Sequence, residues 1–188
     1  MEKINAIAKE LKKGKVIVCP TDTLYGLIVD ATNKKAVDKV FKIKKRPKSK
    51  AIAVFIKNIK EAKRLAFVDR EQEEFLKKVW PGKLTVILKR KQNCDLAKNL
   101  FAGKKVIGLR VSSSKLVNQL VKEINRPLTT TSANISDKPG STRIKDVLEQ
   151  FRGQKLQPDL IINVGNLPKS KPSAVIDLTI FPPKVLRK

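Results

Sequence analysis

The apolar run AIAVFI at residues 51–56 constrains the fold most, because it follows directly on the basic segment KIKKRPKSK at residues 42–50. A continuous apolar run of this kind is typical of a strand buried on both faces of a sheet. Cations at the mouth of a buried strand have little freedom to move, and arginine can bind a phosphate through two parallel hydrogen bonds. The segment therefore predicts an anion site beside a buried strand or, alternatively, a solvated, lysine-rich helix end.

Short apolar strands alternate with amphipathic helices along the rest of the chain. We expect strands at 16–19, 51–56, 84–90, 106–111, 159–165 and 173–179. Apolar side chains at helical spacing predict helices at 3–13, 33–45, 70–80, 113–125 and 143–151, and Asn33 and Asn58 are expected N-caps. This alternation predicts an α/β fold in which helices cover a sheet. The 188 residues, 41% of them hydrophobic, suit one domain spanning 1–188.

Two polar stretches stand beside predicted strand ends. TDTLYGL (21–27) is expected to be a loop, whose Thr and Asp side chains either orient a small polar ligand or cap the turn. LTTTSANISDKPG (128–140) concentrates hydroxyl groups and forms either a neutral anion cradle or a Ser/Thr-rich surface loop. Together with the basic 44–50 segment, these loops can converge on one crevice.

Arg110 lies inside the predicted strand VIGLRV at 106–111. Arginine is seldom fully buried without a partner, so this side chain either pairs with a carboxylate or lines a site and binds a ligand carboxylate or phosphate. The strand itself contains no acidic residue, which favours the ligand.

The chain is strongly basic, since 42 Lys+Arg against 17 Asp+Glu give a formal net charge of +25. Such an excess implies polyanionic partners, most simply RNA or nucleotide phosphates, although a proteome-wide lysine bias is an alternative. The sequence contains no His, which excludes a His general base, a His-based triad and a His metal site. A metal would need oxygen ligands, which points to Mg²⁺ accompanying phosphates.

The expected compartment is the cytoplasm, because Cys19 and Cys94 are too few for a disulfide framework. No run approaches the roughly 20 apolar residues of a membrane span. The N-terminal segment is expected to be a helix ending at Gly14 rather than a signal peptide. Neither a Walker A loop nor a Rossmann glycine motif occurs, so neither explains nucleotide binding.

Six segments occur together in an order and spacing typical of one family. They are PTDTLYGL (20–27), IKKRP (43–47), WPGKLTVIL (80–88), IGLRV (107–111), TSANISDKPG (131–140) and PSAVIDLT (172–179). On these motifs the chain resembles the YrdC-like family from about residue 14 onward. The resemblance implies a twisted, open, mixed sheet flanked by helices, with a concave basic cavity.

The resemblance also implies an activity, that of a threonylcarbamoyl-AMP synthase. Such an enzyme joins L-threonine, bicarbonate and ATP into L-threonylcarbamoyl-adenylate and releases pyrophosphate. The product supplies the group placed on the tRNA adenosine 3′ of the anticodon. A downstream threonylcarbamoyl-transferase complex is therefore an expected partner, and Mg²⁺ is expected to accompany ATP.

The family's signatures can be carried over onto this chain position by position. The KxR signature falls on Lys44 and Arg46, which are implied to be catalytic, and the SxN signature on Ser132 and Asn134. The implied nucleotide contacts are Arg46, Lys50, Val106, Ser132, Asn134, Gly140 and Arg187. The implied threonine contacts are Thr23, Phe55, Arg110, Thr130 and Ser173, with Arg110 on the amino acid's carboxylate. No residue is assigned as a metal ligand.

The chain departs from the family at Phe55, where many members carry a His near the threonine. The chemistry itself needs positioning and charge neutralisation rather than a protein nucleophile, so the lack of His is tolerable. The main alternative is an RNA-binding module, for double-stranded RNA, tRNA or ribosome maturation, that uses the basic concave face. Few aromatic residues (5%) argue against base stacking on single strands. A third hypothesis is carbamoyl-phosphate chemistry on a related domain.

Overall fold

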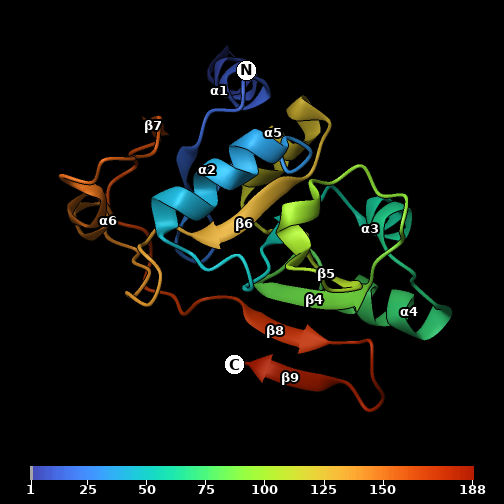
Figure 1. Cartoon of the computed structure of the whole chain (residues 1–188). Coiled ribbons are helices and arrows are strands. Elements are labelled where there is room, and N and C mark those ends of the chain that lie inside the picture. The colour runs from blue at the N-terminus through green and yellow to red at the C-terminus, as the bar shows by residue number, and fades with distance from the viewer. Residues whose placement is uncertain (1) are drawn as a thin grey trace.

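The apolar strands and amphipathic helices assemble into one mixed sheet in the computed structural model, which describes residues 2–188 (Figure 1). The strands are β1 (Ile17–Pro20), β2 (Tyr25–Ile28), β3 (Ala53–Phe55), β4 (Leu84–Lys89), β5 (Val106–Arg110), β6 (Leu128–Ser132), β7 (Leu160–Ile161), β8 (Ala174–Asp177) and β9 (Lys184–Arg187). The helices are α1 (Glu2–Lys12), α2 (Lys34–Lys44), α3 (Ile59–Leu65), α4 (Arg70–Val79), α5 (Lys115–Ile124) and α6 (Ile144–Phe151), with a short 3-10 helix η1 (Lys98–Phe101). The predicted α/β class is confirmed.

The strand order within residues 2–188 is β7-β1-β2-β6-β3-β5-β4-β8-β9. The predicted buried strand β3 lies at the centre, parallel to β5 and antiparallel to β6. In this register Val54 faces Leu109 on one side and Thr129 on the other. The consecutive strands β5, which carries Arg110, and β6, which is rich in hydroxyl groups, are therefore separated by β3, which comes from a much earlier part of the chain.

Helices cover both faces of the sheet around β1. Val16 and Val18 belong to one buried cluster, whereas Ile17 and Cys19 belong to a second. Helix α2 contributes to the first cluster, and α1 and α5, which pack on each other, contribute to the second. Since successive side chains of a strand point to opposite faces, the two clusters lie on opposite sides of β1.

Local capping sets where the helices begin and end. The side chains of Asn33 and Asn58 accept hydrogen bonds from the backbone N–H groups of Ala36 and Glu61, as predicted for N-caps. Lys45 has a φ of 51°, in the left-handed region, and it ends α2. The chain therefore turns immediately toward Arg46 and the cavity described below.

The prediction of a loop at 21–27 is wrong beyond residue 24, because Tyr25–Ile28 form strand β2. This strand pairs antiparallel with β1, where Cys19 faces Gly26, and with β6 on its other edge. Gly26 permits the close pairing, since a Cβ there would lie 3.2 Å from the backbone oxygen of Thr131. Gly is common in turns, and pairing of this segment with β1 and β6 overrode that local preference.

The predicted strand at 159–165 is too long, because β7 comprises only Leu160–Ile161. The Tyr25 hydroxyl donates to the backbone oxygen of Gly165 (2.7 Å) and accepts from the backbone N–H of Val164 (3.2 Å). The backbone groups of Val164 and Gly165 therefore bind the Tyr25 side chain instead of a neighbouring strand. Gly165, with a φ of 77°, turns the chain away from the sheet.

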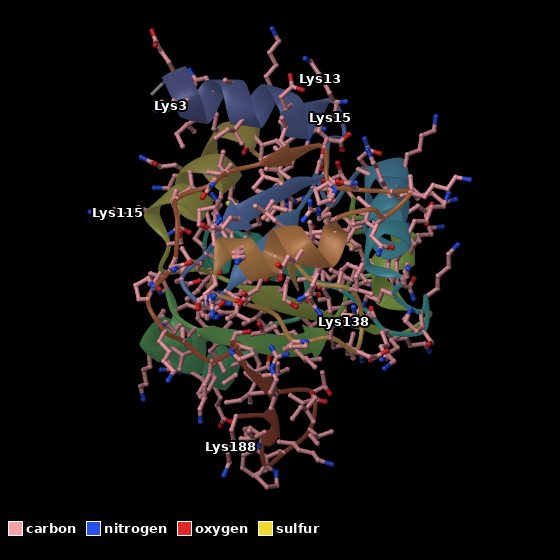
Figure 2. All side chains as sticks on the ribbon, turned by 90° about the vertical axis from the view of Figure 1, so that its left-hand side faces the viewer. Lys3, Lys13, Lys15, Lys115, Lys138 and Lys188 are labelled. Carbon is pink, nitrogen blue, oxygen red and sulfur yellow. The ribbon has the colours of Figure 1, made fainter. Side chains whose placement is uncertain are left out.

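Basic side chains project from many parts of the surface. Figure 2 shows labelled lysines on α1, on the loop after it, at the start of α5, in the loop after β6 and at the C-terminal end: Lys3, Lys13, Lys15, Lys115, Lys138 and Lys188. The excess positive charge is thus distributed over several elements. Across residues 2–188, no helix combines the length and apolar character that crossing a membrane requires.

Candidate functional site

A cavity of about 350 Å³ is lined by strands β2 to β6, by β8 and β9, and by the loop after β1. Most of the predicted site residues line it, namely Thr23, Arg46, Phe55, Val106, Arg110, Thr130, Ser132, Ser173 and Arg187. The cations of its wall are Arg46, Lys104, Arg110 and Arg187, and no Asp or Glu from residues 2–188 belongs to that wall. A cavity of this composition suits an anionic ligand.

Arg46 brings the first cation to the wall, on the turn that follows α2. Its Nε donates to the backbone oxygen of Lys50 (3.0 Å) and its Nη2 to that of Ala51 (2.7 Å). Burial lowers the pKa of the Arg46 guanidinium, and the charge of Asp137 partly opposes this effect. The two backbone bonds fix the guanidinium at the start of β3, beside the hydroxyl-rich end of β6.

Lys44 lies behind the wall rather than on it, with 2% of its surface exposed. Its Nζ donates to the backbone oxygens of Ser132 (2.6 Å) and Asn134 (2.8 Å) and to Asn134 Oδ1 (3.0 Å). Burial, with a smaller effect from the charge of Arg46, lowers the pKa of Lys44 to about 7. Lys44 therefore holds the end of β6 in place, and it affects the cavity through that segment.

Asn134 is likewise structural in its contacts. Its Oδ1 accepts from the Ser132 hydroxyl, and its Nδ2 donates to the backbone oxygens of Ile135 (2.8 Å) and Lys138 (2.6 Å). These bonds shape the loop after β6 so that the Ser132 side chain borders the cavity. Lys44, Ser132 and Asn134 thus form one hydrogen-bonded network behind the wall, and Arg46 and Ser132 lie at the wall itself.

Two other predicted nucleotide contacts lie off the wall. Lys50 is exposed and pairs with Asp137 across 3.0 Å. Gly140 acts by close packing, because a Cβ there would lie 2.9 Å from Leu24 Cδ1 and 3.0 Å from Ser132 Cβ. The absence of a side chain at Gly140 therefore lets the loop approach Ser132.

Arg110 has a carboxylate partner, contrary to the preference drawn from its strand alone. Its Nη2 donates to Asp22 Oδ1 at 2.8 Å, and its Nε donates to the backbone oxygen of Gly82 at 3.0 Å. The pairing was missed because Asp22 lies 88 residues away in sequence. Arg110 nevertheless also lines the cavity, so its ion pair with Asp22 does not remove it from the predicted site.

Phe55 and Thr23 complete this end of the cavity. The Arg110 guanidinium carbon lies 5.6 Å from the centre of the Phe55 ring, within range of a cation–π interaction. The Thr23 backbone N–H donates to the Thr21 hydroxyl at 3.1 Å, which fixes the loop after β1. Thr130 of β6 faces the same cavity.

Arg187 reaches the cavity from the edge strand β9. Its Nε donates to the backbone oxygen of Ser173 at 2.8 Å and its Nη2 to the Ser173 hydroxyl at 3.1 Å. The Ser173 hydroxyl lies 3.2 Å from that of Thr85. Hydroxyl groups from β4 and from the segment before β8 are thereby linked to a cation.

Several residues of the site were not predicted. Among them are Asp22, which binds Arg110, and Thr85 and Lys104, which line the cavity. Asp22 lies in the family motif PTDTLYGL and Thr85 in WPGKLTVIL, so their place in these motifs could have indicated a role in the site. Lys104 gave no signal, because it stands among 42 Lys+Arg. Within residues 2–188, no group of three or more His, Cys, Asp or Glu side chains is placed to hold a metal ion.

The fold and the cavity define a class of α/β proteins with a cation-lined cavity beside a mixed sheet. This chain belongs to the Sua5/YciO/YrdC family, whose model, described as "Telomere recombination", matches residues 9–188. The putative threonylcarbamoyl-AMP synthase of Methanocaldococcus jannaschii is 35% identical over 172 residues, which are 92% of this chain and 78% of that protein.

Two solved structures are close in fold. Sua5 of Pyrococcus abyssi in complex with L-threonine is 32% identical with a TM-score of 0.90, covering 99% of this chain and 54% of that one. Escherichia coli YciO is 29% identical with a TM-score of 0.86, covering 100% of this chain and 89% of that one. The chain thus spans about half the length of P. abyssi Sua5.

Proposed function

We propose that this chain synthesises L-threonylcarbamoyl-adenylate from L-threonine, bicarbonate and ATP, and releases pyrophosphate. The observation that carries the proposal is the meeting of Arg46 and Ser132 with Arg110 and Thr130 around one cavity. Relatives named threonylcarbamoyl-AMP synthase and the L-threonine complex of P. abyssi Sua5 support it. The cavity's cations match the charges of both a nucleotide and an amino acid's carboxylate.

The nucleotide occupies the end of the cavity formed by Arg46, Ser132 and Val106. Arg46 neutralises phosphate charge, and the Ser132 hydroxyl donates to a phosphate oxygen. Lys44 acts as a positioning residue, since its bonds go to the backbone and side-chain oxygens of the SxN segment. Arg187 brings a further positive charge from β9.

Threonine occupies the end formed by Thr23, Phe55, Arg110, Thr130 and Ser173. Its amine attacks the carbon of bicarbonate, water leaves, and a carbamate forms. A carbamate oxygen then attacks the α-phosphorus of ATP, and the bond to the β,γ-pyrophosphate breaks. The chain's residues hold the two reactants in line and neutralise charge as pyrophosphate leaves, so that no protein nucleophile is needed.

Mg²⁺ would enter with the triphosphate and add charge neutralisation on its oxygens. The adenylate then supplies the threonylcarbamoyl group for the tRNA adenosine 3′ of the anticodon, through a downstream transferase complex. The two cysteines of the described chain, Cys19 and Cys94, are free, which fits a reducing cytoplasm as the place of the reaction.

Pyrophosphate release tests the proposal directly. With ATP, bicarbonate and Mg²⁺ present, release is expected only when L-threonine is added. Arg46→Ala should lower the rate by about 100-fold or more, because a charged donor to the phosphates is lost. Lys48→Ala is the matched control, since Lys48 is an exposed cation of the same segment that does not line the cavity. ATP consumption that does not depend on threonine would overturn the proposal.

Direct RNA binding is a second candidate, and it draws on the distributed lysines of Figure 2. Titrating tRNA at two salt concentrations would test it, because phosphate contacts release counterions and make affinity fall steeply with salt. Affinity that hardly changes between the two salt concentrations would argue against a functional RNA surface.

A further inference from the structure

Asp22 is a buried carboxylate of the loop between β1 and β2, and none of the roles given above belongs to it. Its side chain is 7% exposed. Oδ1 accepts from Arg110 Nη2 at 2.8 Å, and Oδ2 accepts from the backbone N–H of Ser113 at 2.9 Å and from its hydroxyl at 2.7 Å. The carboxylate thereby joins the loop after β1 to the turn between β5 and α5.

Arg110 is fixed from three directions. Its Nη2 is held by Asp22, its Nε by the backbone oxygen of Gly82, and its Cζ lies 5.6 Å from the centre of the Phe55 ring. The third nitrogen, Nη1, donates no hydrogen bond to any group of residues 2–188. Arg110 nevertheless lines the cavity. Since the guanidinium is planar, fixing Nε and Nη2 also fixes the direction in which Nη1 points.

Without Asp22, Arg110 would be a buried cation with only a backbone oxygen as partner. Such a charge is costly and turns or shifts toward whatever acceptor or water it can reach. Burial raises the pKa of Asp22, but Arg110 and the hydrogen bonds from Ser113 lower it by more, so the net pKa is below its usual value. The carboxylate is therefore charged at neutral pH and remains paired with the guanidinium.

We propose that Asp22 is a positioning residue of the amino-acid end of the cavity: it orients Arg110 so that the remaining nitrogen, Nη1, binds the α-carboxylate of the substrate amino acid. The inference rests on the proposed function, because it takes threonine as the ligand of that end. It predicts that Asp22 governs threonine affinity and leaves ATP affinity nearly unchanged, although it touches neither ligand.

The first measurement needs only the unchanged protein. Arginine side-chain ¹⁵N spectra report rotation about the Cζ–Nη bonds, and Arg110→Lys assigns the signals by their loss. Restricted rotation of the Arg110 Nη groups is expected in the absence of any ligand. Fully averaged Nη signals, as in a free arginine, would overturn the positioning role.

The second measurement compares Asp22→Asn with Asp95→Asn by calorimetric titration. Asp95 pairs with Arg64 at 2.8 Å on the surface, away from the cavity, so the same substitution breaks an ion pair that does not concern the site. Asp22→Asn should free the Arg110 Nη signals and weaken threonine binding by about 10- to 100-fold, with the ATP dissociation constant changed by about 2-fold at most. Asp95→Asn should leave both affinities unchanged.

Threonine affinity preserved in a folded Asp22→Asn protein would overturn the inference. An equal loss of threonine and ATP affinity would also overturn it, because that pattern indicates general damage to the cavity. If the unchanged protein bound no threonine at all, the proposed function would fail. The rotation of Arg110, measured without substrate, would still decide whether Asp22 positions it.

Discussion

Lys44→Met tests how the buried ammonium behind the cavity affects stability. The substitution keeps the length of the side chain and removes its charge and its three hydrogen bonds to Ser132 and Asn134. Losing these bonds lowers the free energy of unfolding. The more informative effect is on the pH dependence, because burial and the nearby Arg46 lower the pKa of Lys44 from 10.5 to about 7.

The sign and size follow from proton linkage. Between pH 7 and 10.5 the unfolded chain binds a proton at Lys44 and the folded chain does not, so the free energy of unfolding rises with pH in that range. Stability from this group is fully present above pH 10.5 and is lost as the pH falls toward 7. Each pH unit within the range contributes about 1.4 kcal/mol, so that the rise between pH 6 and 9 is about 2.5 kcal/mol.

The assay is urea unfolding of the unchanged protein and of Lys44→Met at several pH values from 6 to 9. The difference between the two curves isolates Lys44, because other titrating groups, such as Cys19 with its pKa raised by burial to about 12, contribute equally to both. The unchanged protein should gain about 2.5 kcal/mol relative to the variant across this range. Parallel curves would refute the reasoning, since they would mean that the three oxygen acceptors keep Lys44 charged throughout.

Two further predictions concern nucleotide binding. Lys104→Ala should raise the ATP dissociation constant by about 5-fold, because Lys104 lines the cavity. Lys105→Ala is the control and should leave the constant unchanged, because Lys105 is exposed and does not line the cavity. Equal effects of the two substitutions would point to general surface charge. Gly140→Ala should displace Ser132, whose Cβ would lie 3.0 Å from the new methyl group, and should weaken ATP binding more than threonine binding in parallel titrations. An unchanged ATP affinity in Gly140→Ala would show that the loop yields without moving the hydroxyl.

The sequence predicted what depends on periodicity and capping. The continuous apolar run at 51–56 correctly located the central strand around Val54, and Asn33 and Asn58 were correctly expected to cap α2 and α3. The convergence of Arg46 and Ser132 on one cavity also follows the expectation that the polar loops meet at one crevice. These features are encoded locally or in short motifs, so a single sequence is sufficient to find them.

The errors arise where distant groups decide the outcome. Tyr25 was assigned to a loop because nothing nearby shows that β6 will pair with β2. The same residue shortens β7, because its hydroxyl binds Val164 and Gly165. The Asp22–Arg110 pair is of this kind as well, since its partners come from separate motifs and only the folded sheet brings them together.

The strand order also affects when the cavity can exist during folding. The central strand β3 has β5 and β6 as neighbours, and β4 lies between β5 and β8. The wall therefore draws on residues from Thr21 to Arg187. Contacts between such distant segments close late and make folding slow. A ligand that contacts every part of this wall would bind only the completed sheet. Bound nucleotide would therefore slow global unfolding and leave the fraying of single helices unaffected.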